Sequence, residues 1–390
     1  MLRRCILCRT CAFRTPRTAS RWQSGIASVD SNKTPLRRLL DDASGFGEIE
    51  TKEPDLMWAT EPYSVRPGES NSEKPRTNPK DTTVLLFPGQ GSQTVGMGKH
   101  LQKIQAAQDL YELASSVVGW DVRRACLAGP ADSAQRAVGV LVTSLAALER
   151  VREERPGALQ RVRAAAGFSL GELAALVFAA ALPLEGALRL ALVRAAAERA
   201  AGRARRGGML ALWLAADARL APLLRDARAH AAERAVAAPV CQVANYMYPG
   251  CKVVAGDLEA LEYVERRGAE YGVRRAARVH AAGALHTPLM ADAAAAVRAA
   301  AALVPARAPR LRVLSAADAR PYADAAHVRR QMARLLTRPV RWEQTLHALY
   351  ARPRTDRLPL TLVLGPGAAL RATLRQVNAR AWDASLQIDV

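Results

Sequence analysis

From Thr82 onward the chain alternates short β-rich runs with longer helical ones, and this alternation restricts the folds that it can adopt. Three of the β-rich runs are TTVLLF (82–87), LRVLS (311–315) and LTLVLG (360–365). Helical periodicity is seen over 101–118, 138–153, 170–181, 185–203, 287–302, 325–336, 342–350 and 368–378. Strands that alternate with helices predict βαβ units and a largely parallel sheet.

The middle of the chain has a different order of elements. Strands are expected in MLALWL (209–214), PVCQVAN (239–245), CKVVAG (251–256) and VRRAARV (273–279). Helices are expected at 217–230 and from a cap at Asp257 to about Tyr271. The resulting β-α-β-β-α-β order is that of a ferredoxin-like unit. We therefore predict an α/β protein. Its α/β-hydrolase-like core (81–205 and 280–390) has a parallel sheet and carries an inserted ferredoxin-like small domain (206–279).

The N-terminal segment has the composition of a targeting sequence. Residues 1–29 hold six arginines and no acidic residue, with serine and threonine interspersed, which is typical of a mitochondrial transit peptide. Arginines interrupt any apolar run there, so a secretory signal is disfavoured. Residues 30–80 are polar and broken by prolines, and we expect a disordered linker.

The cysteines do not predict a metal site. Cys5, Cys8 and Cys11 have the spacing that begins an iron–sulfur ligand run, but Thr15 stands where the fourth ligand is expected. The other three cysteines (Cys126, Cys241 and Cys251) are scattered, as in a protein with reduced thiols.

The formal charge of +20 invites a nucleic-acid interpretation, which the motifs do not support. The chain has neither zinc-finger spacing nor an aromatic–basic run, and its arginines accompany a general alanine–arginine bias. The longest nearly unbroken apolar run, Leu173–Leu184, has 12 residues and is too short to span a bilayer.

A serine lies between two glycines in the segment AAAGFSLGELAAL (164–176). Two interpretations of Ser169 are open on this segment alone. In one, its hydroxyl caps the helix expected from Leu170. In the other, Gly167-x-Ser169-x-Gly171 is a nucleophile elbow, whose glycines allow a sharp strand-to-helix turn that exposes the hydroxyl. An elbow also requires a base, oxyanion donors and an acyl pocket.

His286 is the best candidate for the base. It lies in AAGALHTPLM, at a loop-to-helix junction after a strand, from which a side chain can reach an elbow on a neighbouring strand. The other histidines fall in helical stretches, at a helix end or at a strand end: His100, His230, His280, His327 and His347. A lone histidine is nevertheless more often structural than catalytic, so the assignment needs support from the rest of the chain.

A glycine-rich loop, FPGQGSQTVGMGK (87–99), follows the first strand. It does not match a dinucleotide fingerprint, because Thr94 stands where a third glycine is needed, and the chain contains no G-x-x-x-x-G-K-[ST] phosphate loop. We interpret it as a loop of backbone donors that faces the elbow across the sheet.

Five motifs together resemble the malonyl-CoA:acyl carrier protein transacylases in order and spacing: FPGQGSQTVGMGK, GFSLGELAAL, GALHTPLM, RPVRWEQTL and LGPGAALRATL. The resemblance covers about residues 82–390. Phe168 in the elbow, VANYMYPGCKVV and the Ala-Trp pair near the C-terminus are similar to the mitochondrial branch. The resemblance also implies a large domain with an inserted ferredoxin-like unit, which the periodicity indicates separately.

The resemblance implies a role for each matching residue. Ser169 is the nucleophile that accepts malonyl from coenzyme A, and His286 is its general base, oriented by a backbone carbonyl rather than by a buried acid. The backbone N–H groups of Gln90 and Leu170 form the oxyanion hole. Arg194, which helix periodicity alone would leave in solvent, binds the malonyl carboxylate through its fork of donors.

Further expectations follow from the same resemblance. Gly89 and Gly91 line the substrate site, and no cofactor or metal ion is needed. The partners are malonyl-CoA and an acidic acyl carrier protein, with clustered arginines (Arg203, Arg205, Arg206) as candidates for docking it. The chain is expected to act as a monomer in the mitochondrial matrix, without nucleic acid.

The sequence departs from the family pattern at three places. It lacks a Gln-Pro pair before Ser144 and is shorter near 137–142, Val363 replaces a usual glutamate, and Ala195 replaces a usual glycine. Two other functions stay open. A serine hydrolase or thioesterase would share the elbow and histidine but would not need Arg194. A protein-binding scaffold would need neither Ser169 nor His286.

Overall fold

The computed structural model describes residues 82–353 and 355–390, which belong to one compact unit. The predicted transit peptide (1–29), the predicted linker (30–80) and the three N-terminal cysteines (Cys5, Cys8, Cys11) lie outside the described residues. No helix in the described part is long and apolar enough to cross a membrane.

A parallel sheet forms the core of the large domain. Its strands, in spatial order, are β7 (Arg312–Leu314), β2 (Val162–Gly167), β1 (Thr83–Phe87), β8 (Leu360–Leu364) and β9 (Ser385–Ile388). All four neighbouring pairs are parallel. Every residue of β1 is buried, as expected for a central strand that is covered on both faces.

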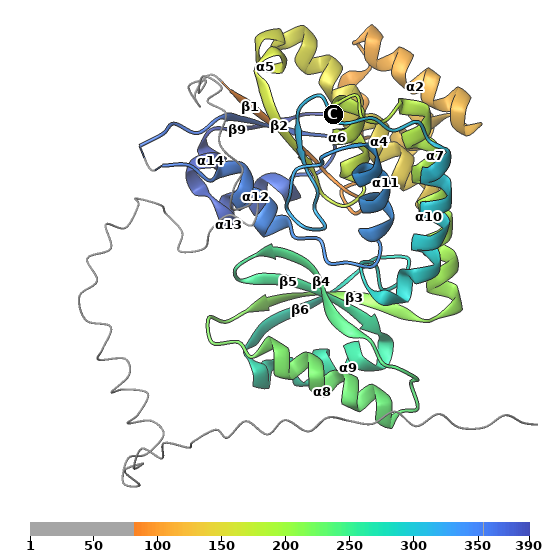
Figure 1. Ribbon diagram of the computed structural model, residues 1–390, viewed down its shortest axis with the longest axis vertical. Coiled ribbons are helices and arrows are strands. Elements are labelled where there is room, and N and C mark those ends of the chain that lie inside the picture. The colour runs from red at the N-terminus through yellow and green to blue at the C-terminus, as the bar shows by residue number, and fades with distance from the viewer. Residues whose placement is uncertain (1–81, 354) are drawn as a thin grey trace, which may run out of the picture. The chain divides into compact units, whose positions relative to one another are not determined.

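Helices cover both faces of this sheet (Figure 1). One face carries α2 (Gln105–Val118), α3 (Val122–Ala128), α4 (Ser133–Glu154), α5 (Pro156–Gln160), α6 (Gly171–Phe178), α7 (Leu184–Ala204), α10 (Ala291–Leu303) and α11 (Ala325–Arg334). The other face carries α12 (Trp342–Tyr350), α13 (Ala369–Val377) and α14 (Ala379–Asp383). Alternate residues of β1 enter the two cores: Leu85 and Phe87 pack in the first, Val84 and Leu86 in the second.

The inserted domain is an antiparallel sheet with two helices. Its strands β3 (Gly207–Leu214), β4 (Cys241–Tyr248), β5 (Cys251–Asp257) and β6 (Val273–Val279) pair in the order β4-β5-β3-β6. Helices α8 (Leu220–Glu233) and α9 (Leu258–Arg267) pack on one face of the sheet, as Figure 1 shows. This is the ferredoxin-like arrangement, so the predicted fold class is confirmed.

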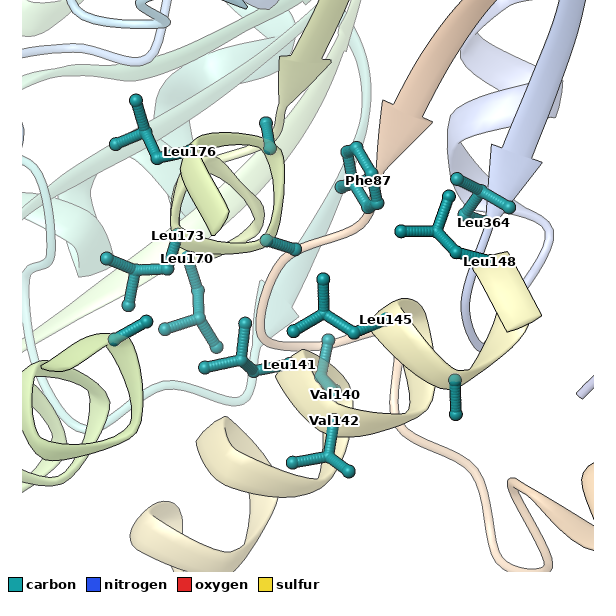
Figure 2. Close-up of a cluster of buried hydrophobic side chains, with 14 of the residues drawn as sticks. Phe87, Val140, Leu141, Val142, Leu145, Leu148, Leu170, Leu173, Leu176 and Leu364 are labelled. Atoms are coloured by element: carbon teal, nitrogen blue, oxygen red, sulfur yellow. The ribbon is translucent and has the colours of Figure 1, made fainter. Parts of the chain in front are cut away.

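Helix α4 packs against the elbow, at the carboxyl end of strand β2. Figure 2 shows its side chains Val140, Leu141 and Leu145 beside Leu170 of the elbow and Phe87 of β1. The helix is continuous and is buried from Ala137 to Leu148. The segment that departs from the family pattern, 137–142, therefore lies within an unbroken helix that packs against the elbow.

Short elements account for most differences between the expected and observed structure. Helices α3, α5 and α14 and the four-residue strand β9 had no counterpart among the expected elements, and β2 was implied only by the elbow interpretation of Ser169. The remaining short elements are 3₁₀ turns: η2 (Lys99–Leu101), η3 (Gly268–Tyr271) and η4 (Pro288–Met290). Asp257 stands at the N-cap position of α9, as predicted, but its side chain does not cap the helix. Its carboxylate makes no capping bond and instead accepts from Arg205 and from the backbone N–H of Val240.

Candidate active site

Ser169 lies at the sharp turn between β2 and α6 and is buried. Its φ is 54°, a left-handed conformation that non-glycine residues seldom adopt outside strained sites. The flanking glycines are required by close packing, because a Cβ at Gly167 would overlap the backbone of Gly171, and one at Gly171 would overlap the carbonyl of Phe87. The hydroxyl makes no capping bond to α6. The geometry is that of a nucleophile elbow rather than of a helix cap.

The His286 side chain lies next to Ser169, although the two residues are 117 positions apart in the sequence. The distance from Ser169 Oγ to His286 Nε2 is 2.9 Å, and that from His286 Nδ1 to the carbonyl oxygen of Leu335 is 2.6 Å. A carbonyl only accepts, so Nδ1 carries the proton and Nε2 is left to accept from the serine hydroxyl. His286 also has a left-handed backbone, with φ of 62°.

Burial keeps His286 uncharged. It lowers the pKa of the imidazole to about 3, and the nearby Arg194 charge acts in the same direction. The hydrogen bonds with Leu335 and Arg338 oppose this shift of the pKa and do not cancel it. At neutral pH the ring is therefore free to take the proton of Ser169.

Arg194 is buried and points at the same hydroxyl. Its Nη2 donates to Ser169 Oγ at 2.8 Å, and its Nε donates to Glu198 Oε1 at 2.7 Å. Arg194 and Glu198 are four residues apart on α7 and so share one face of the helix. The sequence interpretation missed Glu198. The available signal was an acid four residues after the candidate arginine.

The glycine-rich loop packs against the elbow. A Cβ on Gly89 would overlap the carbonyl oxygen of Phe168. The backbone N–H of Phe168 donates to the carbonyl oxygen of Phe87 at 2.9 Å. The N–H of Gly91 donates to the Gln93 side chain at 2.7 Å, which orders the turn.

Two backbone donors are unpaired within the described residues: the N–H of Gln90 in the glycine-rich loop and that of Leu170 directly after the serine. Leu170 is only 1% exposed, and buried N–H groups without partners are rare. The two donors are therefore available for an oxygen atom of a ligand.

Glu172, on the elbow helix, is a second buried acid that the sequence interpretation missed. It accepts hydrogen bonds from the Tyr322 hydroxyl at 2.7 Å and from the N–H of Ala316. Burial raises the pKa of this carboxyl to about 7. It makes no hydrogen bond to His286, so among the described residues the imidazole is oriented by a carbonyl and not by an acid.

The three clustered arginines differ in their pairing and exposure. Arg205 forms a two-point ion pair with Asp257, so it is not a free docking residue, whereas Arg203 and Arg206 are exposed.

A cavity of about 930 Å³ lies between α8, β4 and the 337–341 loop. Gln242 lines it and donates to the backbone carbonyl of His286, but neither His286 nor Ser169 is among the residues that line the cavity. Within the described residues no group of histidine, cysteine and acidic side chains is placed to hold a metal.

Comparison with known proteins agrees with this fold. The acyl transferase domain family matches residues 84–358. The chain is 41% identical, over 95% of its length and 94% of the relative's, to a probable mitochondrial malonyl-CoA-acyl carrier protein transacylase of Drosophila melanogaster. It is 37% identical to the human mitochondrial transacylase, over 81% of this chain and 82% of that one.

A crystal structure of a malonyl-CoA:acyl carrier protein transacylase from Xanthomonas oryzae is also similar. Its TM-score is 0.71 at 28% identity, with 80% of this chain and 95% of that chain covered. The chain therefore belongs to the acyl transferase family, in the group of malonyl-CoA-acyl carrier protein transacylases.

Proposed function

We propose that this protein transfers the malonyl group of malonyl-CoA to the phosphopantetheine thiol of acyl carrier protein, through a malonyl ester on Ser169. The observation that carries the proposal is the position of one hydroxyl between a neutral base and a buried cation. Ser169 Oγ lies 2.9 Å from His286 Nε2 and 2.8 Å from Arg194 Nη2.

The first half-reaction starts with proton transfer. His286 Nε2 takes the hydroxyl proton as Ser169 Oγ attacks the thioester carbonyl carbon. The negative charge that develops on the carbonyl oxygen is stabilised by the N–H groups of Gln90 and Leu170. The C–S bond then breaks, and the imidazolium returns its proton to the departing sulfur of coenzyme A. Meanwhile Arg194 exchanges its bond to Ser169 Oγ for bonds to the malonyl carboxylate.

The second half-reaction repeats these steps with a different thiol. His286 deprotonates the phosphopantetheine thiol of the carrier, and the thiolate attacks the ester carbonyl. Ser169 Oγ leaves and regains the proton from the imidazolium, so no net proton is consumed. We propose that a single chain suffices, because Ser169, His286 and Arg194 all come from one chain.

We place this activity in mitochondrial fatty acid synthesis, in the matrix. The relatives from Drosophila melanogaster, Homo sapiens and Mus musculus are mitochondrial transacylases. Residues 1–29 add the arginine-rich, acid-free composition of a transit peptide.

A serine hydrolase is the second candidate, since it would use the same serine and histidine. Arg194 favours the transferase, because a hydrolase of uncharged acyl groups has no use for a buried guanidinium beside its nucleophile.

Intact mass spectrometry after incubation with malonyl-CoA separates the two candidates. A malonyl adduct should form, persist in buffer and disappear when carrier protein with its phosphopantetheine is added, while Ser169→Ala should show none. Rapid loss of the adduct to water without carrier would favour the hydrolase, and no adduct together with no consumption of malonyl-CoA would contradict both.

A further inference from the structure

The active site contains a negative charge that the proposed reaction does not use. Glu198 is 2% exposed, and its carboxylate lies 2.7 Å from Arg194 Nε. Glu198 accepts from Nε and Ser169 Oγ accepts from Nη2, so two different nitrogens of the guanidinium bind the carboxylate and the hydroxyl. The cation expected to bind the malonyl carboxylate is thus already paired before substrate arrives.

The pairing changes the charge balance of the site. His286 is neutral, so the charged groups in contact with Ser169 and its arginine are the guanidinium and the Glu198 carboxylate. Glu172, a further buried acid, is bound to Tyr322 and Ala316 instead of Arg194, and burial raises the pKa of its carboxyl to about 7. An uncharged acyl group leaves the ion pair balanced, whereas a malonyl group adds a negative charge, and among the described residues Arg194 is the only buried arginine or lysine. Buried charge without a partner is costly, so Glu198 weakens the preference for malonyl.

We infer that Glu198 determines acyl selectivity by balancing the charge of Arg194, so that the site accepts short uncharged acyl groups such as acetyl as well as malonyl. This inference rests on the proposed function. Glu198 touches no reacting atom, so it is a positioning and charge-balancing residue that acts through Arg194.

Helix stability is not a sufficient reason for this pair. A buried ion pair gains little net stability, because the desolvation of both charges offsets their attraction. The same helix carries an exposed pair at the same spacing, Arg189 with Glu185, at 2.6 Å. That pair provides a matched control, since it shares the helix and the spacing but lies in solvent.

The test compares kcat/KM for malonyl-CoA and acetyl-CoA in wild type and Glu198→Gln. Glutamine keeps an acceptor oxygen for Arg194 Nε and removes only the charge. The malonyl-to-acetyl ratio should rise about 10- to 100-fold, as expected for a unit charge a few ångströms away. Glu185→Gln should leave the ratio unchanged. A folded Glu198→Gln enzyme whose ratio stays the same or falls would overturn the inference.

Two further measurements cover a variant that fails to fold. Glu198→Met, which replaces the carboxylate with an apolar side chain of similar length, should raise the same ratio. Wild-type enzyme incubated with acetyl-CoA should show an acetyl adduct on Ser169 by intact mass, and its absence would overturn the inference without any variant. Failure of the wild type to form a malonyl adduct would contradict the proposed function instead.

Discussion

At the scale of single residues, the site depends on two strained positions that meet. Ser169 and His286 both have positive φ, at 54° and 62°, and each such position costs on the order of 1–3 kcal/mol. The hydrogen bonds from Ser169 to His286 and from His286 to Leu335 hold both side chains in place. The strain is therefore maintained by the same contacts that orient the proposed nucleophile and base.

The two residues should act as one unit. Ser169→Ala should reduce transfer on the order of 10⁴-fold or more, and His286→Ala nearly as much, because each removes the activated hydroxyl. The double variant should lose little beyond either single one. Transfer rates of the three variants to holo carrier protein provide the check, and losses that multiply would contradict a dyad.

The activity should survive acid better than that of an ordinary histidine enzyme. The base must be neutral, and the pKa of His286 is lowered from 6.5 to about 3 by burial and then by Arg194. kcat/KM should stay flat from pH 7 to about pH 5, where an unshifted imidazole would be mostly protonated. Circular dichroism over the same range controls for acid unfolding. Half-loss of kcat/KM near pH 6.5 in a folded enzyme would contradict the shift.

Arg194→Ala should reduce kcat/KM for malonyl-CoA by about 2–5 kcal/mol of transition-state stabilisation, the range for truncating one member of a buried charged pair. Acetyl-CoA should lose far less, because it brings no carboxylate. Arg194→Lys should restore only part of the malonyl activity, since an ammonium lacks the planar fork. An equal loss for both thioesters would make Arg194 a structural residue.

The site residues that could be identified from sequence have a local signal, whereas the two acids that were missed do not. Ser169 was identifiable because its glycines report a backbone constraint, and His286 because few histidines compete. Glu172 and Glu198 look like solvated helix residues, since α6 and α7 do not reveal from sequence which acid is covered by another element. Their burial depends on residues distant in sequence, such as Tyr322 for Glu172.

At the scale of elements, the elbow helix is joined to the loop after β7 by one carboxyl group. Glu172 of α6 binds Ala316 and Tyr322, which follow β7, the strand next to β2 in the sheet.

The long helices and most strands of this arrangement were predictable, because their apolar patterns extend over several turns or alternations. Helices of five to seven residues such as α5 and α3 were not, since one or two turns have no readable period.

This carboxyl group should make stability depend on pH. Its pKa is raised from 4.5 to about 7 in the folded protein, so the folded state holds the proton more tightly than the unfolded state. Its contribution is complete below pH 4.5 and is lost as pH rises through 7. Relative to wild type, Glu172→Gln should therefore become more favourable by roughly 2–3 kcal/mol between pH 4.5 and 8.

Denaturant unfolding of both proteins at several pH values tests the claim. Tyr322→Phe is the control that keeps the acid and removes one of its hydrogen-bond donors. A stability difference between wild type and Glu172→Gln that does not change with pH would contradict the raised pKa.

At the scale of the whole molecule, positive charge dominates. The formal charge is +20, and residues 1–29 contribute six of these charges, so the rest of the chain stays strongly basic. Arg203 and Arg206 lie exposed at the end of α7, the helix that carries Arg194 to the serine, while Arg205 is paired with Asp257. An acidic carrier should therefore be attracted to the basic surface at this helix end.

Transfer to the carrier should weaken as salt rises. At subsaturating carrier we expect the rate to fall several-fold between about 50 and 500 mM salt, since screening shortens the range of exposed charges. Arg203→Glu with Arg206→Glu should lower the rate at low salt and flatten its salt dependence. The matched control reverses Arg155 and Arg161, two exposed arginines just before β2, at the end of that strand away from the elbow. Malonyl-serine formation, followed by mass, should stay the same in both double variants. A carrier rate independent of salt, or an equal loss in the two double variants, would show that these arginines do not steer the carrier.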